Sequence, residues 1–104
     1  MIFDTHAHLA WCVDAPTTDI ASLSQSLPAQ AYLAVSTTLE DSLQTLDLNQ
    51  TVSSAQPAIG VHPWFIQSDP GLVDDVIKRL SDLLQSRPEA AIGEIGLDKS
   101  IVDQ

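Results

Sequence analysis

The stretch AIGVHPWFIQSDPGLVDDVIKRLSDLLQSRPEAAIGEI, residues 58–95, decides the fold. It opens and closes with short apolar runs that predict two β-strands, Ala58–His62 and Ala91–Ile95. Between them, the Asp-Pro pair at 69–70 is a strong helix start, apolar side chains follow at helical spacing, and the Arg-Pro pair at 87–88 ends the helix. The stretch is therefore predicted to be one strand–helix–strand unit.

The same alternation continues toward the N-terminus. Two further apolar runs predict strands at Ile2–His6 and Ala31–Thr37. Between them, a short helix is expected to be capped by Thr17 or Thr18 and stopped by Pro28. After the second strand, a further helix is predicted from a capping-box spacing and a leucine face (Thr37 and Glu40; Leu39, Leu43 and Leu46).

The order of elements is thus βαβαβαβ, which predicts an α/β fold. Such alternation implies four parallel strands in one sheet, joined by right-handed crossovers. An open doubly wound sheet and a (β/α) barrel both satisfy this order, and the spacing of the elements does not choose between them.

Length and composition limit the kind of protein. The 104 residues suffice for one small domain, residues 1–104. No apolar run approaches the ~20 residues of a membrane span, and the N-terminus lacks a basic leader region. The single cysteine, Cys12, fits a reducing compartment. A cytoplasmic protein without membrane association is expected.

The net charge of -10 bears on possible substrates. Nucleic-acid binders usually carry basic patches. This chain has four basic side chains, all late in the sequence (Lys78, Arg79, Arg87 and Lys99). If the substrate is a phosphodiester, bound cations must therefore supply most of the local positive charge.

The segment Asp4-Thr5-His6-Ala7-His8 carries the sharpest local signal for chemistry. Residues i and i+2 of a strand point to the same face, so His6 and His8 present two imidazoles that one metal ion can bridge. Asp4 lies on that face and is expected to accept a hydrogen bond from one imidazole. Two unrelated surface histidines would give the same pattern, but the place at the end of a strand favours a metal site.

Two more chemical groups follow predicted strands. His62 precedes Pro63, which cannot continue a strand, so the chain is expected to turn and present this imidazole to the site. An ordinary core or loop histidine is equally compatible with that segment. Glu94 stands among apolar residues, where a carboxylate is costly to bury unless it is paired or bound to a cation. A metal ion is the natural partner.

Three motifs together carry a family resemblance. They are Asp4-x-His6-x-His8-Leu9, Gly60-x-His62-Pro63 and Gly93-Glu94-Ile95-Gly96-Leu97-Asp98, in this order and at strand ends. They resemble the first three signatures of the TatD family of metal-dependent hydrolases. The resemblance covers essentially the whole chain, although residues 11–56 match in pattern rather than in motif.

The resemblance implies the N-terminal half of a TIM (β/α)8 barrel, two divalent metal ions (zinc, magnesium or manganese) and phosphodiester hydrolysis of DNA. His6 and His8 would ligate one metal, and Glu94 would bridge both and act in catalysis. His62 would be a catalytic group that binds the scissile phosphate. Family members continue for four more strands that carry further ligands, and a full barrel needs roughly 200–250 residues. The chain is therefore expected to be truncated and incomplete as an enzyme.

Other functions remain open at this point. Another His-x-His barrel, such as a PHP-type phosphoesterase or an amidohydrolase, shares the first motif, but the Gly-Glu-Ile-Gly-Leu-Asp stretch argues against it. A non-catalytic fragment or a partner subunit of a split barrel is the remaining alternative. Exposed strand edges lead us to expect self-association or pairing with a complementary C-terminal half.

Overall fold

The structure is a computed structural model that describes residues 2–10, 31–66 and 70–96. Its strands are β1 (Phe3–Ala7), β2 (Ala31–Val35), β3 (Ala55–Ile59) and β4 (Ala91–Ile92). Its helices are α3 (Leu39–Thr51), the 3-10 turn η1 (Pro63–Phe65) and α4 (Pro70–Ser86). The helix expected between Thr17 and Pro28 lies outside the described residues.

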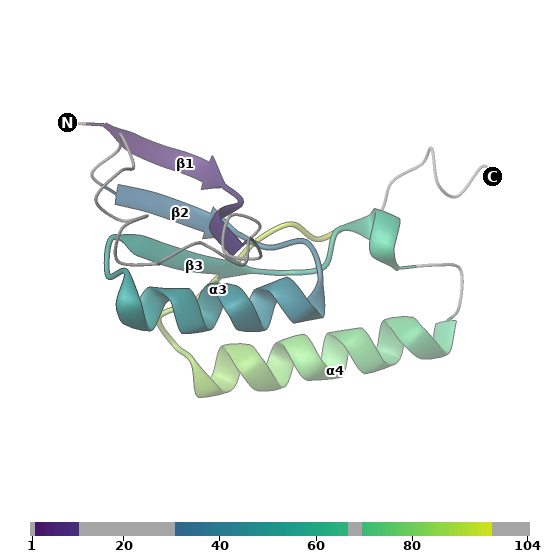
Figure 1. Cartoon of the computed structure of the whole chain (residues 1–104). Coiled ribbons are helices and arrows are strands. Elements are labelled where there is room, and N and C mark those ends of the chain that lie inside the picture. The colour runs from purple at the N-terminus through teal and green to yellow at the C-terminus, as the bar shows by residue number, and fades with distance from the viewer. Residues whose placement is uncertain (1, 11–30, 67–69, 97–104) are drawn as a thin grey trace.

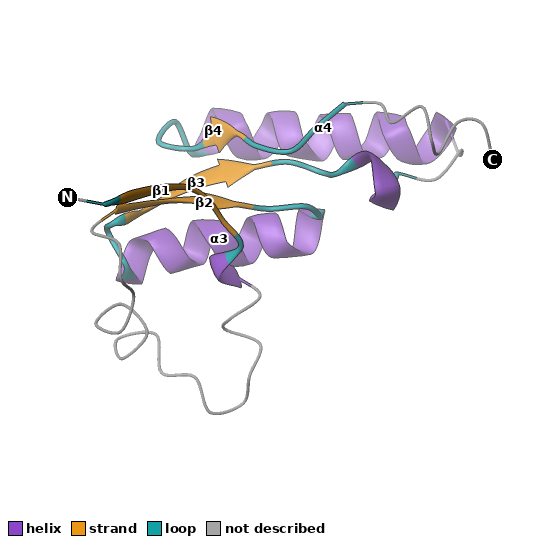
Figure 2. Ribbon diagram, turned by 90° about the horizontal axis from the view of Figure 1, so that it is seen from above, coloured by secondary structure: helices purple, strands orange, loops and turns teal. Residues whose placement is uncertain are grey.

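The four strands form one sheet in the order β1-β2-β3-β4, and each neighbouring pair is parallel. The predicted α/β fold with four parallel strands is confirmed. In Figure 1, β1, β2 and β3 lie side by side and α3 runs along them. α4 also lies below the strands in Figure 1, where it contacts α3, and Figure 2 shows that the two helices run in roughly the same direction. No helix among the described residues is long and apolar enough to cross a membrane.

The third strand begins three residues earlier than predicted. It runs over Ala55–Ile59 instead of Ala58–His62, and it includes Pro57. Proline lacks an N–H group and is tolerated where no partner strand requires one. β4 pairs with Ala58 and Ile59 and does not extend to Pro57. No hydrogen bond from β4 therefore requires an N–H group at Pro57. After Ile59 the chain leaves the sheet toward His62.

The other strand ends differ by smaller amounts. β2 ends at Val35 instead of Thr37, and β1 covers Phe3–Ala7 with an irregular register between Asp4 and Ala7. β4 has only two residues, although the N–H of Gly93 still donates to Ile59 O at 2.7 Å. The last strand is thus shorter than the predicted Ala91–Ile95.

The capping box of α3 lies one residue later than predicted. Thr38, not Thr37, is the N-cap, and its hydroxyl accepts from the N–H of Asp41. The Asp41 carboxylate accepts in return from the N–H groups of Thr37 and Thr38. The carbonyl of an N-cap residue accepts the first hydrogen bond of the helix. The carbonyl of Thr37 instead accepts from the N–H of His62 at 2.8 Å. The hydrogen bond between Thr37 and His62 is therefore consistent with Thr38 as the N-cap of α3.

The two helices are buried to different extents. α3 buries Leu46 and Leu48, and Leu48 packs in the core with Tyr32, Ala34 and Ala55 of the sheet. The expected leucine face is nevertheless partly wrong, because Leu43 is 45% exposed. Among the side chains of α4 that the structure describes, only Val76 is buried, and Ile77 of the predicted apolar face is 57% exposed. α4 ends at Ser86, before Pro88, as predicted.

Candidate metal centre

Three of the predicted site residues meet at the carboxyl ends of the strands. His6 lies in β1, His8 follows it directly, and Glu94 follows β4 by two residues. In a flat sheet, three strand spacings of about 4.8 Å would separate β1 from β4 by about 14 Å. Glu94 Oε1 nevertheless lies 2.8 Å from His6 Nε2. The sheet must curve around the site, which favours a barrel wall over an open doubly wound sheet.

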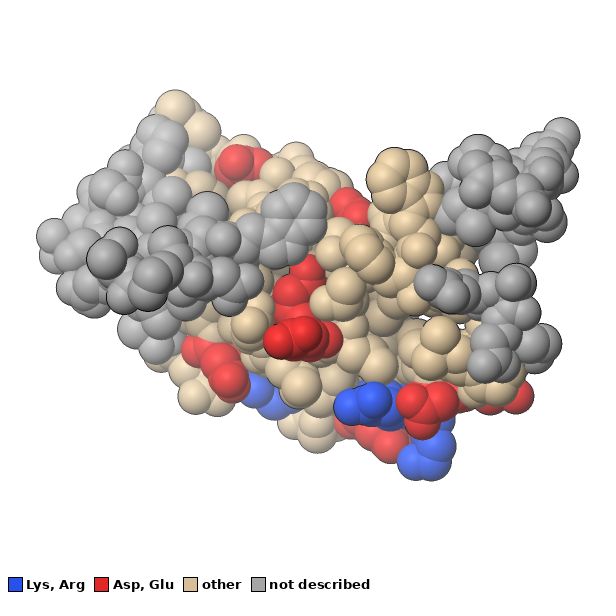
Figure 3. All heavy atoms as spheres, turned by 45° about the vertical axis from the view of Figure 1, so that its right-hand side comes forward, with Lys and Arg blue, Asp and Glu red and all other residues tan. Residues whose placement is uncertain are grey.

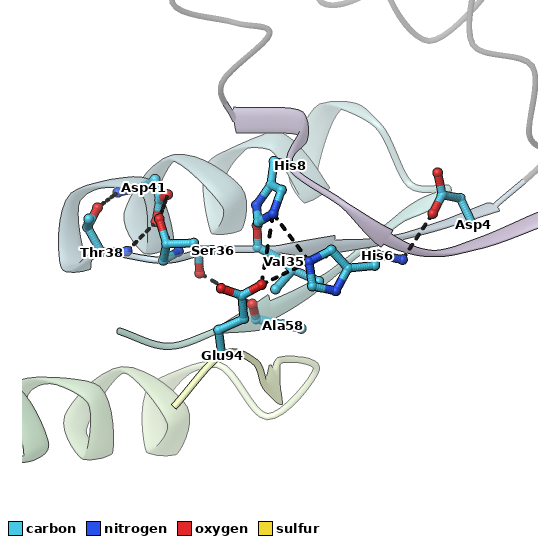
Figure 4. Close-up of polar contacts among 10 residues, drawn as sticks. Asp4, His6, His8, Val35, Ser36, Thr38, Asp41, Ala58 and Glu94 are labelled. Atoms are coloured by element: carbon cyan, nitrogen blue, oxygen red, sulfur yellow. Dashed lines mark hydrogen bonds and ion pairs between the residues drawn. The ribbon is translucent and has the colours of Figure 1, made fainter. Parts of the chain in front are cut away.

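The donor atoms are close enough to share one ion (Figure 4). His6 Nε2 lies 3.2 Å from His8 Nε2, and Glu94 Oε1 lies 3.9 Å from His8 Nε2. The ligand atoms of His6, His8 and Glu94 all lie within 4.8 Å of one another. Tetrahedral bonds of about 2.0–2.1 Å place zinc ligands about 3.3 Å apart. The observed separations lie on either side of that value, so the three groups fit a divalent cation.

His8 is oriented by the neighbouring strand. Its Nδ1 lies 3.1 Å from the carbonyl oxygen of Val35, the last residue of β2. A carbonyl only accepts hydrogen bonds, so Nδ1 must carry the proton and Nε2 keeps its lone pair for the metal. Sequence reasoning gave this supporting role to Asp4. Instead, Asp4 Oδ1 accepts from the backbone N–H of His6 at 3.0 Å, and Figure 4 shows its carboxylate away from the imidazoles.

Two glycines let the Glu94 segment approach the end of β3. A Cβ on Gly60 would lie 2.4 Å from the carbonyl oxygen of Glu94, and one on Gly93 would lie 2.4 Å from that of Ala58. No side chain fits at either distance. The two backbones are therefore in direct contact, and this contact holds Glu94 next to the histidines. Its side chain is 23% exposed, as is that of His8, whereas that of His6 is 57% exposed.

His62 is placed differently from the other three residues. It is the N-cap of η1, and its Nδ1 accepts from the N–H of Trp64 at 3.1 Å. Its ring contacts those of Trp64 and Phe65 edge-on. Among the described residues, the group of possible metal ligands consists of His6, His8 and Glu94 and does not include His62. The structure thus brings together His6, His8 and Glu94, and leaves His62 on the turn that follows β3.

Some parts of the site have no clear sequence signal. The carbonyl of Val35 is a backbone group, and nothing in the residue type marks it as a ligand support. Gly60 and Gly93 are visible in the sequence, and the approach of another backbone is one reason for glycine near a strand end. Asp98, which belongs to the third motif, lies outside the described residues.

Together, the curved parallel sheet and the donor group at its strand ends define part of a β/α barrel that carries a candidate metal centre. The model of the family of TatD-related DNases matches residues 3–104, and the chain belongs to this family. The four parallel strands correspond to the N-terminal half of the TatD barrel, and at the family level the chain is a TatD-type hydrolase. No curated protein and no solved structure gives a significant match.

Proposed function

We propose that the site hydrolyses phosphodiester bonds of DNA and depends on divalent metal ions. The observation that carries the proposal is the convergence of His6 Nε2, His8 Nε2 and Glu94 Oε1 from the two outer strands of the described sheet. Two neutral imidazoles and a carboxylate form a ligand set typical of catalytic zinc and related metals. When bound, a divalent ion would polarise the phosphoryl group and activate a water molecule.

The hydrogen bond from Trp64 determines which ring nitrogen of His62 can act as a donor. The Trp64 N–H donates to His62 Nδ1, so the neutral ring carries its proton on Nε2. That N–H is a donor for a non-bridging phosphate oxygen. We propose that His62 binds the scissile phosphate in this way, as a group that contacts substrate and not as a metal ligand.

The charge of the protein supports a role for cations in binding DNA. The described basic side chains lie on or just after α4, where Lys78 pairs with Asp82 and Arg79 with Asp75. On the face drawn in Figure 3, the blue basic groups lie low on the surface with red acidic groups beside them. These pairs leave little positive charge for phosphates, so the metal would have to supply it. Trp64 is 66% exposed and Phe65 is 52% exposed, and such rings can stack on nucleobases without regard to sequence.

We propose that a second ion shares Glu94 with the first. Two-metal sites hold their ions about 3.5–4 Å apart and bridge them with a carboxylate of this kind. The described residues offer one group of three donors, so the second ion would be held with lower affinity than the first. Zinc, magnesium and manganese are the candidate ions, and the hydrolysis rate measured with each of them distinguishes among them.

The test is hydrolysis of bis(p-nitrophenyl) phosphate and of a DNA oligonucleotide with each metal in turn. We expect Glu94→Gln to lower the metal-dependent rate by more than about 100-fold, because it removes the charge that neutralises the ion. Glu89→Gln is the matched control, since Glu89 pairs with Arg87 outside the site. Hydrolysis by the wild type that persists with excess chelator, or a Glu94→Gln rate equal to that of the wild type with metal present, would refute the proposal.

Two other outcomes separate the alternatives. Metal binding without turnover of either substrate would favour a non-catalytic protein that retains the site. Cleavage of amide or lactone substrates in preference to phosphodiesters would favour an amidohydrolase-type reaction. Both results would contradict DNA hydrolysis while leaving the family and the fold intact.

A further inference from the structure

A cluster of buried hydroxyl groups lies between α3 and the ends of β2 and β3. Ser36 and Ser42 are both 0% exposed, and their hydroxyl oxygens lie 2.9 Å apart. Ser36 directly follows Val35, whose carbonyl orients His8. Ser42 contacts both polar backbone atoms of Gly60, the residue that abuts Glu94. The pair thus connects the backbone supports of two candidate ligands.

The distances favour one arrangement of the two hydroxyl protons, in which the longer contacts to Gly60 O (3.2 Å) and Ala58 O (3.3 Å) receive neither. A serine hydroxyl has one proton to donate and can accept two hydrogen bonds. The shortest contact of Ser42 Oγ is to Thr38 O, at 2.7 Å, so its proton goes there. Ser42 Oγ can then accept from the Ser36 hydroxyl at 2.9 Å and from the Gly60 N–H at 3.3 Å. Ser42 is therefore the acceptor for the Gly60 N–H, which is itself buried.

This acceptor lies where β3 leaves the sheet. The β3–β2 register stops at Ala58, opposite Val35, so β2 supplies no ladder partner for Gly60. The backbone contact between Gly60 and Glu94 leaves no room for a Cβ, so a displaced Gly60 would move the Glu94 backbone with it. A ligand set needs donor positions accurate to a few tenths of an ångström.

We propose that Ser42, supported by Ser36, is a positioning residue of the metal centre: its hydroxyl fixes Gly60, and Gly60 fixes the backbone of Glu94 relative to His8. Ser42 contacts neither metal nor substrate. Groups that hydrogen-bond to a ligand directly affect metal affinity about 10–100-fold, and we expect Ser42, which acts through Gly60, to lie at the lower end of that range. The inference rests on the proposed function, because it assumes that His6, His8 and Glu94 bind a metal.

The test is a titration of the full chain with Co²⁺, followed by the absorption of the bound ion, for wild type, Ser42→Ala and Thr45→Val. We expect Ser42→Ala to weaken Co²⁺ binding by about tenfold and to change the absorption spectrum. Thr45→Val is the matched control. Thr45 lies one turn further along α3, is 1% exposed, and its hydroxyl has no hydrogen-bond partner among the described residues. Its affinity for Co²⁺ should equal that of wild type.

Thermal melts of the metal-free proteins separate positioning from general stability. If Ser42→Ala melts earlier but binds Co²⁺ with wild-type affinity and spectrum, its role is structural and the inference is wrong. Ser36→Ala provides a second variant, and its effect on affinity should not add to that of Ser42→Ala, because both act through one hydrogen-bonded pair. Failure of the wild type itself to bind Co²⁺ would instead refute the proposed metal site, and with it the inference.

Discussion

His6 and His8 are held in different ways. The imidazole of His8 is largely buried and hydrogen-bonded to Val35 O, which fixes both its orientation and its tautomer. The imidazole of His6 is 57% exposed and lies 2.8 Å from Glu94 Oε1. We infer that His8 is the preorganised ligand and that His6 and Glu94 complete the set as the ion binds.

The contact between Gly60 and Glu94 leads to a prediction at the scale of the residue. Gly60→Ala places a methyl group 2.4 Å from a backbone oxygen, so one of the two segments must shift. We expect a loss of about 1–3 kcal/mol in the free energy of unfolding and a fall of more than tenfold in metal affinity. Chemical denaturation and metal titration measure the two effects.

Gly71→Ala is the control for that substitution. Gly71 is exposed in the first turn of α4, and alanine is favoured over glycine within a helix. It should leave metal affinity unchanged and not reduce stability. Wild-type metal affinity in Gly60→Ala would contradict the role assigned to this backbone contact.

At the scale of the element, the sequence predicted the type and order of the four strands and of α3 and α4, but not the 3-10 turn η1, and several boundaries were set by tertiary contacts. The run Thr37-Thr38-Leu39-Glu40-Asp41 allows two overlapping capping boxes, and the structure forms the second, in which Thr37 O accepts from the distant N–H of His62. Likewise, the predicted strand began at Ala58, whereas β3 begins at Ala55 and includes Pro57, whose β4 side is unpaired. Local patterns do not contain such information.

The candidate site was predictable to a similar extent. Strand alternation and the cost of a buried carboxylate were enough to identify His6, His8 and Glu94 as a possible group. The supports were not predictable, because Val35 acts through its carbonyl and Ser42 through a buried hydroxyl on a helix that precedes β3. Their roles depend on distances between segments far apart in sequence.

At the scale of the whole molecule, the described sheet has two edges. β1 and β4 each pair on one side only, and both carry exposed apolar side chains: Phe3 is 55% exposed and Ile92 is 62% exposed. A closed barrel would pair such edges and cover these side chains. We therefore propose that the chain forms contacts through this surface, with a second copy or with a complementary C-terminal half.

Light scattering on the purified chain tests this proposal. We expect a mass above that of the 11.2 kDa monomer, and Phe3→Lys together with Ile92→Lys should lower it, because charges on an edge oppose pairing. Trp64→Lys is the control, since Trp64 is equally exposed but lies on η1. A monomeric mass with a sharp cooperative melt would show that these strands are stable without a partner.

The central claim is that one divalent ion binds between the outer strands of this sheet. A crystal structure of the zinc-soaked protein, with anomalous data at the zinc edge, tests it most directly. The account predicts an anomalous peak about 2.0–2.2 Å from His6 Nε2, His8 Nε2 and a carboxylate oxygen of Glu94, with the Nδ1 of His8 still bonded to Val35 O. An ion bound without Glu94, or no ion at these three residues at saturating zinc, would contradict it.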